Sequence, residues 1–374
     1  MKVAILTLPL GHNYGGILQA YALSTILKES GHDVSILDRR AKPIPYHRQA
    51  KQALRSIREK LRLWTNPPSA PPSGLLSQDF ENLKRFIRMH LPLTEELKSS
   101  HTLRRHYRSK QYEFLLIGSD QVWRPRYAPN LLENFGSFLD STDARGSYAA
   151  SFGVSHWELS SGETQLCREL LKRFGGISVR ESSGIDLCKQ HFRIDAEHHV
   201  DPTLLLTNRK YSQLLTGEYS RFTDAVANYI LDETPFTRFI SSRVARYLGK
   251  REESFFPWMA PAAGDLLRTR VHPHVEDWLM LFRDASFIIT DSFHGCVFSI
   301  IFNKPFLALG NIRRGLARFK SLLAQLDLEN HLILDHELEL SHALADVKWD
   351  KVNEIISQER ERSIEYLSKI LAGA

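Results

Sequence analysis

Residues 287–302 have the sequence Phe287-Ile-Ile-Thr-Asp-Ser-Phe-His-Gly-Cys-Val-Phe-Ser-Ile-Ile-Phe302, in which a short polar turn separates two apolar runs. The first run has the length of a buried strand, and the second is long enough for a buried helix. Asp291 and Ser292 fall between them, where the N-cap of a helix belongs. The pattern therefore predicts that His294 lies in the first turn of a helix, at the carboxyl end of a parallel strand. Ligands bind at this edge in open α/β sheets.

A histidine in this position has two interpretations. The first N–H groups of a helix carry a partial positive charge that suits phosphate or carboxylate, and His294 can give or take a proton near such an anion. The structural interpretation is a packed histidine beside the cap of a buried helix. Cys296 suggests a Cys–His nucleophile, which we disfavour because residues two apart on a helix point in different directions.

The composition is that of an ordinary globular protein. The chain has 374 residues, enough for two domains, and is 43% hydrophobic and 25% charged. We expect neither a transmembrane helix nor a signal peptide, because the apolar runs are too short. The three cysteines lie far apart without a CxxC motif, which favours a reducing compartment and hence the cytoplasm.

The net charge of +6 and a pI of about 9.1 favour anionic partners. We expect no nucleic acid among them, because no nucleic-acid-binding motif is present. Positive charge is densest from Arg39 to Arg62, where nine Lys or Arg residues accompany one acid. Apolar residues up to Trp64 recur there at helical spacing, so the segment predicts a basic amphipathic helix. It either contacts an anionic membrane surface or packs on the domain with a solvated basic face.

Strands and helices alternate along most of the chain, which predicts parallel sheets covered on both faces. The first unit is a strand at 2–8, a glycine-rich turn, a helix at 17–29 and a strand at 32–38. Its turn lacks the GxGxxG pattern, so we do not expect a nicotinamide cofactor. We predict an N-terminal α/β domain over 1–210, a C-terminal α/β domain over 211–350, and a terminal helix over 351–374 that crosses back to the first domain.

Several motifs at predicted strand ends resemble one family, the polysaccharide pyruvyl transferases. Residues 290–295 (Thr-Asp-Ser-Phe-His-Gly), followed by Asn-Lys-Pro-Phe at 303–306, are similar to the C-terminal motif of that family. Residues 13–15 (Asn-Tyr-Gly) and 118–123 (Gly-Ser-Asp-Gln-Val-Trp) are similar to two N-terminal motifs. The resemblance implies a GT-B-like fold, with two Rossmann-like α/β domains whose parallel sheets face a central cleft.

The same resemblance implies a reaction. Members take phosphoenolpyruvate (PEP) as donor and form a pyruvate ketal on two hydroxyls of a sugar in a surface polysaccharide, such as a capsule or exopolysaccharide, with release of phosphate. It also implies an acceptor that is in some cases linked to a lipid carrier at the inner face of the cytoplasmic membrane, and so a peripheral membrane contact. No cofactor and no metal are expected.

Candidate roles follow from the resemblance and from the chemistry. His294 is the expected general acid, because one group must protonate the PEP methylene near neutral pH. The residues expected to bind PEP are Arg180, Ser292, Phe293, Gly295, Arg313, Arg314 and Arg318. The residues expected at the acceptor site or cleft are Asn13, Tyr14, Gly15, Ser119, Asp120, Gln121 and Trp123.

One position departs from the family pattern. Some relatives have an arginine two residues before the histidine, where this chain has Ser292. The missing cation must then come from elsewhere, for example from Arg313 or Arg314. Two other functions stay open from the sequence: a GT-B glycosyltransferase with a nucleotide-sugar donor, and a non-catalytic glycan-binding assembly protein.

Overall fold

The computed structural model describes residues 1–40, 77–128, 130–217, 220–256, 258–261, 268–311, 314–334, 344 and 346–373. The basic amphipathic helix expected between Arg39 and Trp64 lies almost entirely outside these ranges, and so does Arg313. Arg39 itself is buried and forms an ion pair with Glu133, with Nε 2.6 Å from Oε2.

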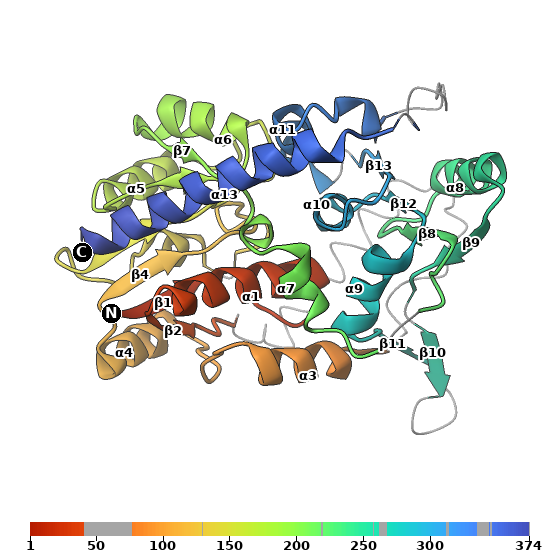
Figure 1. Ribbon diagram of the computed structural model, residues 1–374. Helices are drawn as coiled ribbons and strands as arrows, with labels where there is room; N and C mark the ends of the chain where they lie inside the picture. Colours follow the sequence, from red (N-terminus) through yellow and green to blue (C-terminus); the bar gives the residue numbers. More distant parts are fainter. Residues whose placement is uncertain are drawn as a thin grey trace, which may run out of the picture.

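Two parallel sheets form the centres of the two halves of the molecule (Figure 1). The first has the order β2-β1-β4-β5, with bounds Asp33–Ile36, Lys2–Leu6, Phe114–Ile117 and Ala144–Ser147. Single bridges through Ala150 extend it to β6 (Ser178–Val179), which pairs with β7 (Glu197–His198). The second has the order β14-β13-β12-β8-β9, with bounds Leu332–Ile333, Phe306–Leu309, Phe287–Thr290, Ala225–Tyr229 and Arg251–Ser254.

Helices cover both faces of each sheet. The α-helices are α1 Tyr14–Glu29, α3 Glu81–His90, α4 Ser100–Lys110, α5 Ser161–Leu171, α6 Ser182–Leu187, α7 Asn208–Ser212, α8 Pro235–Leu248, α9 Val275–Asp284, α10 Phe293–Ile301, α11 Ala317–Gln325 and α13 Trp349–Ala372. Shorter helical turns are η1 Leu131–Phe135, the π-helix η2 Cys188–Phe192, η3 Pro202–Leu205 and η5 Glu329–His331. Side chains alternate along β1, so Val3 and Ile5 pack in the core with α1, while Ala4 and Leu6 pack with α4 and η1.

The structure differs from the predicted elements at a few places. Helix α1 begins at Tyr14, three residues early, because Asn13 caps it and Gly15 and Gly16 belong to its first turn. Strand β5 ends at Ser147, and Ala150, which follows it, makes only single bridges.

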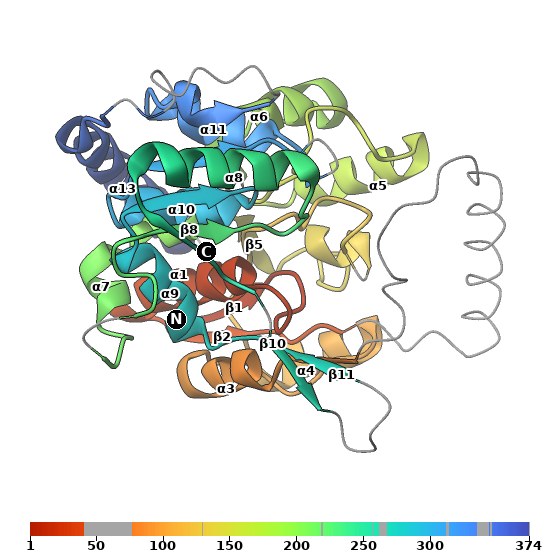
Figure 2. The ribbon, with the colours of Figure 1, turned by 90° about the vertical axis from the view of Figure 1, so that its right-hand side faces the viewer.

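A small third sheet, which we did not predict, joins the two halves. Strand β3 (Ser77–Asp79) pairs in parallel with β11 (Arg268–Val271), and β11 pairs with β10 (Trp258–Pro261). The β10–β11 hairpin extends from the second half toward α3, as two views show (Figure 1; Figure 2). The pairing therefore attaches the second domain to the first through the backbone.

The hydrophobic core is also continuous between the halves. The ring of Tyr14 stacks on Trp278 with centroids 5.7 Å apart, and its hydroxyl donates to the carbonyl of Pro273 at 2.8 Å. Burial raises the pKa of Tyr14 far above its usual value, so the phenol stays a hydrogen-bond donor. Tyr14 thus holds the start of α1 against the second domain.

Helix α13 follows the second domain in the chain and returns to the first sheet (Figure 1). The hydroxyl of Tyr366 donates to the carbonyl of Ser147 at 2.9 Å, and Ile370 is buried against Gly146 and Gly176. A Cβ added at Gly176 would lie 2.3 Å from Cγ2 of Ile370. The helix therefore completes the first domain and needs a glycine beneath it.

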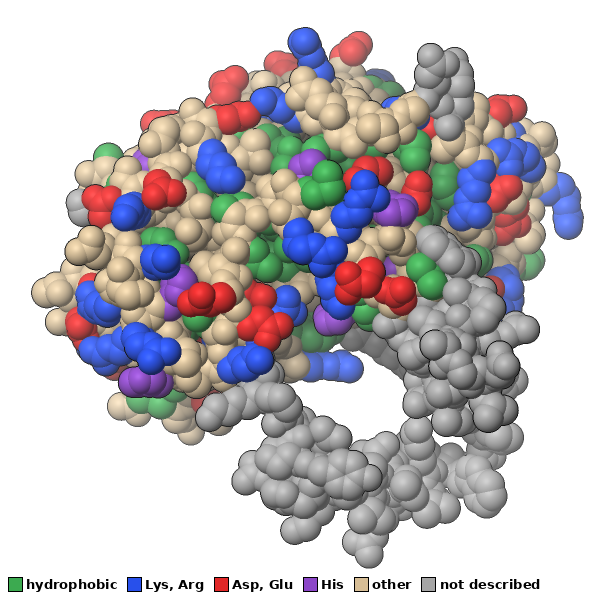
Figure 3. Space-filling view, turned by 90° about the horizontal axis from the view of Figure 1, so that it is seen from below, with side chains coloured by type: hydrophobic (Ala, Val, Ile, Leu, Met, Phe, Trp, Pro, Cys, Tyr) green, Lys and Arg blue, Asp and Glu red, His purple; other side chains and the backbone are tan. Residues whose placement is uncertain are grey.

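Charge on the face over α3 and α4 is mixed. Basic and acidic side chains lie interspersed on the underside of the molecule (Figure 3). Two of the ion pairs in this region join Lys84 to Glu81 and Arg104 to Asp140. Among the described residues, no helix is both long and apolar enough to cross a membrane.

We predict that Gly176→Ala destabilises the protein by about 1–3 kcal/mol, because the added methyl group overlaps Ile370 and pushes α13 away. The unfolding midpoint in urea measures this effect. Gly162→Ala is the matched control, since a Cβ there meets open space at the start of α5. A similar loss in both variants, or no recovery in Gly176→Ala/Ile370→Ala, would contradict the packing argument.

Candidate active site

The turn between β12 and α10 is fixed by its own polar side chains. Ser292 is the N-cap of α10, as predicted, and its hydroxyl accepts the N–H of Gly295 at 3.3 Å. The carboxylate of Asp291 accepts the N–H groups of Leu231 and Asp232 at 2.6 and 3.0 Å, which ties the end of β12 to the end of β8. These contacts hold the first turn of α10, and with it His294, at the domain interface.

Helix α1 of the first domain meets α10 at this point. A Cβ added at Gly15 would lie 2.1 Å from both Cγ and Nδ1 of His294. No side chain fits between them, so the glycine lets the backbone of α1 contact the imidazole directly. Two helix N-termini, from different domains, therefore converge on one histidine.

His294 faces a buried carboxylate of the first domain. Its Nε2 lies 3.6 Å from Oδ2 of Asp201, and the same oxygen accepts from Nη1 of Arg180 at 2.6 Å. The side chains of Arg180 and Asp201 are each only 1% exposed. Burial opposes ionisation of Asp201, but contact with His294 and the charges of His294 and Arg180 outweigh it and hold the pKa of Asp201 far below its usual value.

Two arginines flank the ring of Phe293. The guanidinium carbon of Arg180 lies 4.9 Å from the ring centroid, and that of Arg318 lies 5.2 Å from it. Burial and the nearby charge of Arg180 lower the pKa of Arg318 to about 10. Three buried nitrogens of this group have no hydrogen-bond acceptor among the described residues: Nε of Arg180, Nε of Arg318 and Nε2 of His294. Arg180, Arg318 and His294 together form what we call the cationic cluster.

Asp120 connects this cluster to a cavity. Its Oδ1 accepts from Nη2 of Arg180 at 3.4 Å and from the N–H of Gln121 at 2.9 Å. Burial would raise the pKa of Asp120, but the charges of Arg180, His294 and Arg318 lower it, so the carboxylate stays ionised. Its backbone φ of 75° is uncommon for a residue with a side chain and directs the carboxylate toward the cleft.

The cavity has a volume of about 190 Å³ and opens at the carboxyl end of β1. Its lining consists of Leu8, Pro9, Leu10, Gly11, Asn13, Gly16, Gln19, Asp120 and Tyr127. Two acceptors face no donor: Oε1 of the buried Gln19 has no partner, and Oδ2 of Asp120 accepts no bond from the described residues. The cavity therefore suits a ligand with hydroxyl donors.

Other expected site residues have supporting positions. Trp123 is fully buried, and its indole N–H donates to the carbonyl of Asn134 at 3.0 Å. Ser119 is also buried and donates to the carbonyl of Ala149. Arg314 forms a half-exposed ion pair with Asp232, with Nε 2.7 Å from Oδ2, and its carbonyl accepts from Nη2 of Arg318 at 3.2 Å. These residues shape the loops of the cleft, and the structure brings Arg318 to the cluster instead of Arg314.

The two domains contact each other at Gly153 and Gly315. A Cβ at Gly315 would lie 2.1 Å from the carbonyl oxygen of Gly153, and a Cβ at Gly153 would lie 2.0 Å from Oε1 of Gln121, which belongs to the same domain. Gly315 has a φ of 89°, which favours glycine. Asn13 lies in the cavity wall and is the N-cap of α1. Its side chain accepts the N–H of Gly15 at 3.0 Å.

The sequence reasoning missed Asp201 and Gln19. Asp201 follows β7 just as Asp120 follows β4, so the rule that polar residues at strand ends form the site would have selected it. Gln19 lies on a helical face between apolar residues and carries no such signal.

A family model for polysaccharide pyruvyl transferases matches residues 13–313, which is most of the chain. The chain belongs to this family. Membership in this family supports a transferase that acts on a polysaccharide. A search of curated proteins finds no match.

Solved structures show that the fold of this chain is shared by other proteins. The co-structure of S. aureus MnaA with UDP is similar, with a TM-score of 0.51, 11% identity, and coverage of 98% of this chain and 91% of that one. A putative UDP-N-acetylglucosamine 2-epimerase from Listeria monocytogenes gives a TM-score of 0.48 at 11% identity, with the same coverage. The predicted fold class, two α/β domains in a GT-B-like arrangement, is confirmed.

We predict that Asp201→Asn destabilises the protein by about 3–5 kcal/mol, because it leaves the buried Arg180 and His294 without their shared charge. The midpoint of urea unfolding measures it. The lowered pKa of Asp201 also makes its contribution to the free energy of unfolding depend on pH. The contribution is present above the usual pKa of an aspartate and is lost as the pH falls toward the lowered value.

Asp327→Asn is the matched control for that substitution. It removes an exposed ion pair with Lys351, whose side chains are 65% and 59% exposed, so we expect a change of less than about 1 kcal/mol. Equal midpoints for the two variants would mean that Asp201 does not stabilise the domain interface.

Proposed function

We propose that this protein transfers pyruvate from PEP to two hydroxyls of a sugar in a surface polysaccharide, forming a pyruvate ketal and releasing phosphate. The observation that carries the proposal is the cationic cluster of Arg180, Arg318 and His294, in which Nε of each arginine is buried and has no acceptor among the described residues. Buried donors without partners are costly, and a small anion would satisfy them.

PEP matches the cluster because it carries both a phosphate and a carboxylate. Guanidinium groups bind either anion with two hydrogen bonds, and the N-terminus of α10 adds a partial positive charge. Arg318 supplies the cation that some relatives have at the position of Ser292. The ring of Phe293 contacts both guanidiniums and neutralises neither.

His294 is the general acid of the proposed reaction. It donates a proton to the methylene carbon of PEP, and positive charge develops at C2, which a sugar hydroxyl attacks. Asp201 contacts the ring from its Nε2 side and fixes its orientation. Phosphate then leaves C2 with the bonding electron pair, and the second hydroxyl bonds to C2 and loses its proton to close the ketal ring.

The cavity beside Asp120 is the proposed site of the acceptor. Sugar hydroxyls can donate to Oε1 of Gln19 and to Oδ2 of Asp120, the two acceptors that lack donors. Asp120 is held ionised, so it can also accept the proton of an attacking hydroxyl. Donor and acceptor would thus meet at Asp120, which contacts both the cluster and the cavity.

The test is incubation with PEP and a panel of acceptor glycans, measured as phosphate release and as a mass gain for pyruvate. We expect transfer by the wild type and a loss of about 10²–10⁴-fold in His294→Ala, because the variant lacks the proton donor. Activity above about a tenth of the wild type would exclude His294 as the general acid.

Two control arms separate the competing functions. Release of UDP from a UDP-sugar, without turnover of PEP, would instead identify a glycosyltransferase, and glycan binding without either reaction would identify a binding protein. We expect EDTA to leave the rate unchanged, since arginines and a helix N-terminus meet the charge of PEP. Loss of activity with EDTA, restored by a divalent ion, would show a metal requirement.

Two glycine substitutions test the contact with the histidine. Gly15→Ala places a methyl group on His294, so we expect at least about a hundredfold lower turnover with the fold retained. Gly162→Ala is the control, because a Cβ there meets open space at the start of α5, outside the candidate active site. We expect that variant to keep turnover within a few fold. The opposite order would show that the position of the imidazole does not limit the reaction.

A further inference from the structure

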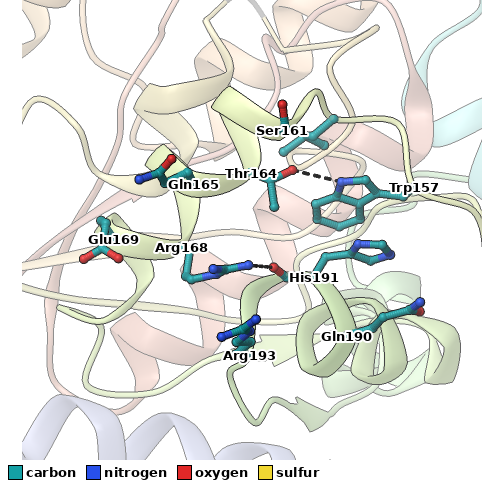
Figure 4. Close-up of a pocket in the computed structure, with 10 residues that line it drawn as sticks. Trp157, Ser161, Thr164, Gln165, Arg168, Glu169, Gln190, His191 and Arg193 are labelled. Carbon is teal, nitrogen blue, oxygen red and sulfur yellow. Dashed lines mark hydrogen bonds between the residues drawn. The ribbon is translucent and has the colours of Figure 1, made fainter.

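A groove beside α5 lies outside the candidate active site (Figure 4). Its volume is about 570 Å³, larger than the cavity at Asp120. The residues that line it come from the loop before α5, from α5 and from the region of η2: Trp157, Leu159, Ser161, Thr164, Gln165, Arg168, Glu169, Gln190, His191 and Arg193. The mechanism proposed above uses none of them.

One side of the groove is a fixed aromatic wall. The rings of Trp157 and His191 are stacked, with centroids 4.1 Å apart and an angle of 12° between their planes. The indole N–H donates to the hydroxyl of Thr164 at 3.0 Å, and the edge of Phe192 packs against the indole at 4.9 Å. Carbohydrate sites use such rigid aromatic surfaces, since they offer apolar contact to the C–H groups of a sugar ring at little entropic cost.

The groove also has positive charge that no acid in it balances. Among the residues that the structure describes, Arg168 binds only the carbonyl of His191, at 2.5 Å, and its buried Nε has no acceptor. Arg193 is exposed and has no ion pair with any described residue. The one carboxylate in the lining, Glu169, is 2.7 Å from Nζ of Lys172 and is thereby neutralised. The groove therefore favours a ligand with both hydroxyls and a negative charge.

The groove is connected to the active cleft by a fixed loop. Residues 152–157 run from the cleft to Trp157, and Glu181 holds the beginning of this loop by accepting the N–H groups of Phe152 and Gly153 at 2.7 and 2.9 Å. Glu181 directly follows Arg180, a member of the cationic cluster. A glycan held in the groove would thus have a defined place relative to the site of transfer.

We propose that this groove binds an acidic stretch of the glycan, with its sugar rings against Trp157 and His191 and its carboxylates on Arg168 and Arg193. The ligand class is a carboxylate-bearing oligosaccharide. The inference rests on the proposed function, because a pyruvate ketal adds a carboxylate to each modified repeat. The groove then retains the modified part of the polymer while the next repeat enters the cleft.

Calorimetric titration of the full chain, without PEP, tests this inference. The probe is a hexasaccharide of mannuronate, and the neutral control ligand is cellohexaose. We expect saturable binding of the acidic probe and at least tenfold weaker binding of the neutral one. Arg168→Gln/Arg193→Gln should weaken binding of the acidic probe at least tenfold, because it removes both cations of the groove.

Arg173→Gln is the control variant, since it removes one positive charge near the end of α5 but outside the lining of the groove. We expect it to bind the acidic probe within about twofold of the wild type. Equal loss in this variant would mean that general charge attraction, not the groove, binds the probe. No binding at millimolar concentration, or equal binding of cellohexaose, would also overturn the inference.

The two proposals can fail separately. Transfer of pyruvate from PEP with no binding of the hexasaccharide would overturn the groove and leave the reaction in place. Arg168- and Arg193-dependent binding without turnover of PEP would leave the groove as an acidic-glycan site and overturn its stated role, retention during pyruvyl transfer.

Discussion

A single carboxylate oxygen, Oδ2 of Asp201, faces cations from two domains. Arg180 belongs to the first domain and His294 to the second, and both depend on the same buried acid. Arg180 and Asp201 pair within the first domain, and the contact of His294 with the same oxygen brings the second domain against this buried pair. The contact of Gly15 with the imidazole and the stacking of Tyr14 on Trp278 pack the two domains together at the same place. The candidate active site is therefore built from the contacts that join the two domains.

The acids of the cluster do not balance the charge of Arg318. Asp120 and Asp201 partly compensate Arg180, yet Arg318 has no carboxylate at hydrogen-bond distance among the described residues and lies close enough to Arg180 to lower its own pKa. Like charges at short distance are unfavourable, and an anion that bridges them would convert that repulsion into binding energy. The same arrangement places His294 beside the carboxylate of Asp201, which fixes the position of the imidazole.

Local patterns predicted much of this structure, and long-range packing supplied the rest. The cap at Ser292, the strand before it and the helix after it depend on neighbouring residues, so the sequence was sufficient for them. The contact of Arg318 with Phe293 depends on which side of α11 faces that ring, and no local pattern contains this information. The burial of Trp123 and the pairing of β3 with β11 likewise arise from contacts between distant segments. The basic amphipathic helix predicted after Arg39 stays a prediction, because its residues lie almost entirely outside the described ranges.

The path of α13 has a consequence for synthesis on the ribosome. This helix supplies Tyr366 and Ile370 to the first domain, although the whole second domain is translated before it. Domains usually fold in the order in which they are made. Here the first sheet has an uncovered apolar surface until the last helix leaves the exit tunnel. The nascent chain thus exposes Gly146 and Gly176, with the apolar surface around them, throughout translation of the second domain, and this period is when binding by chaperones would matter most.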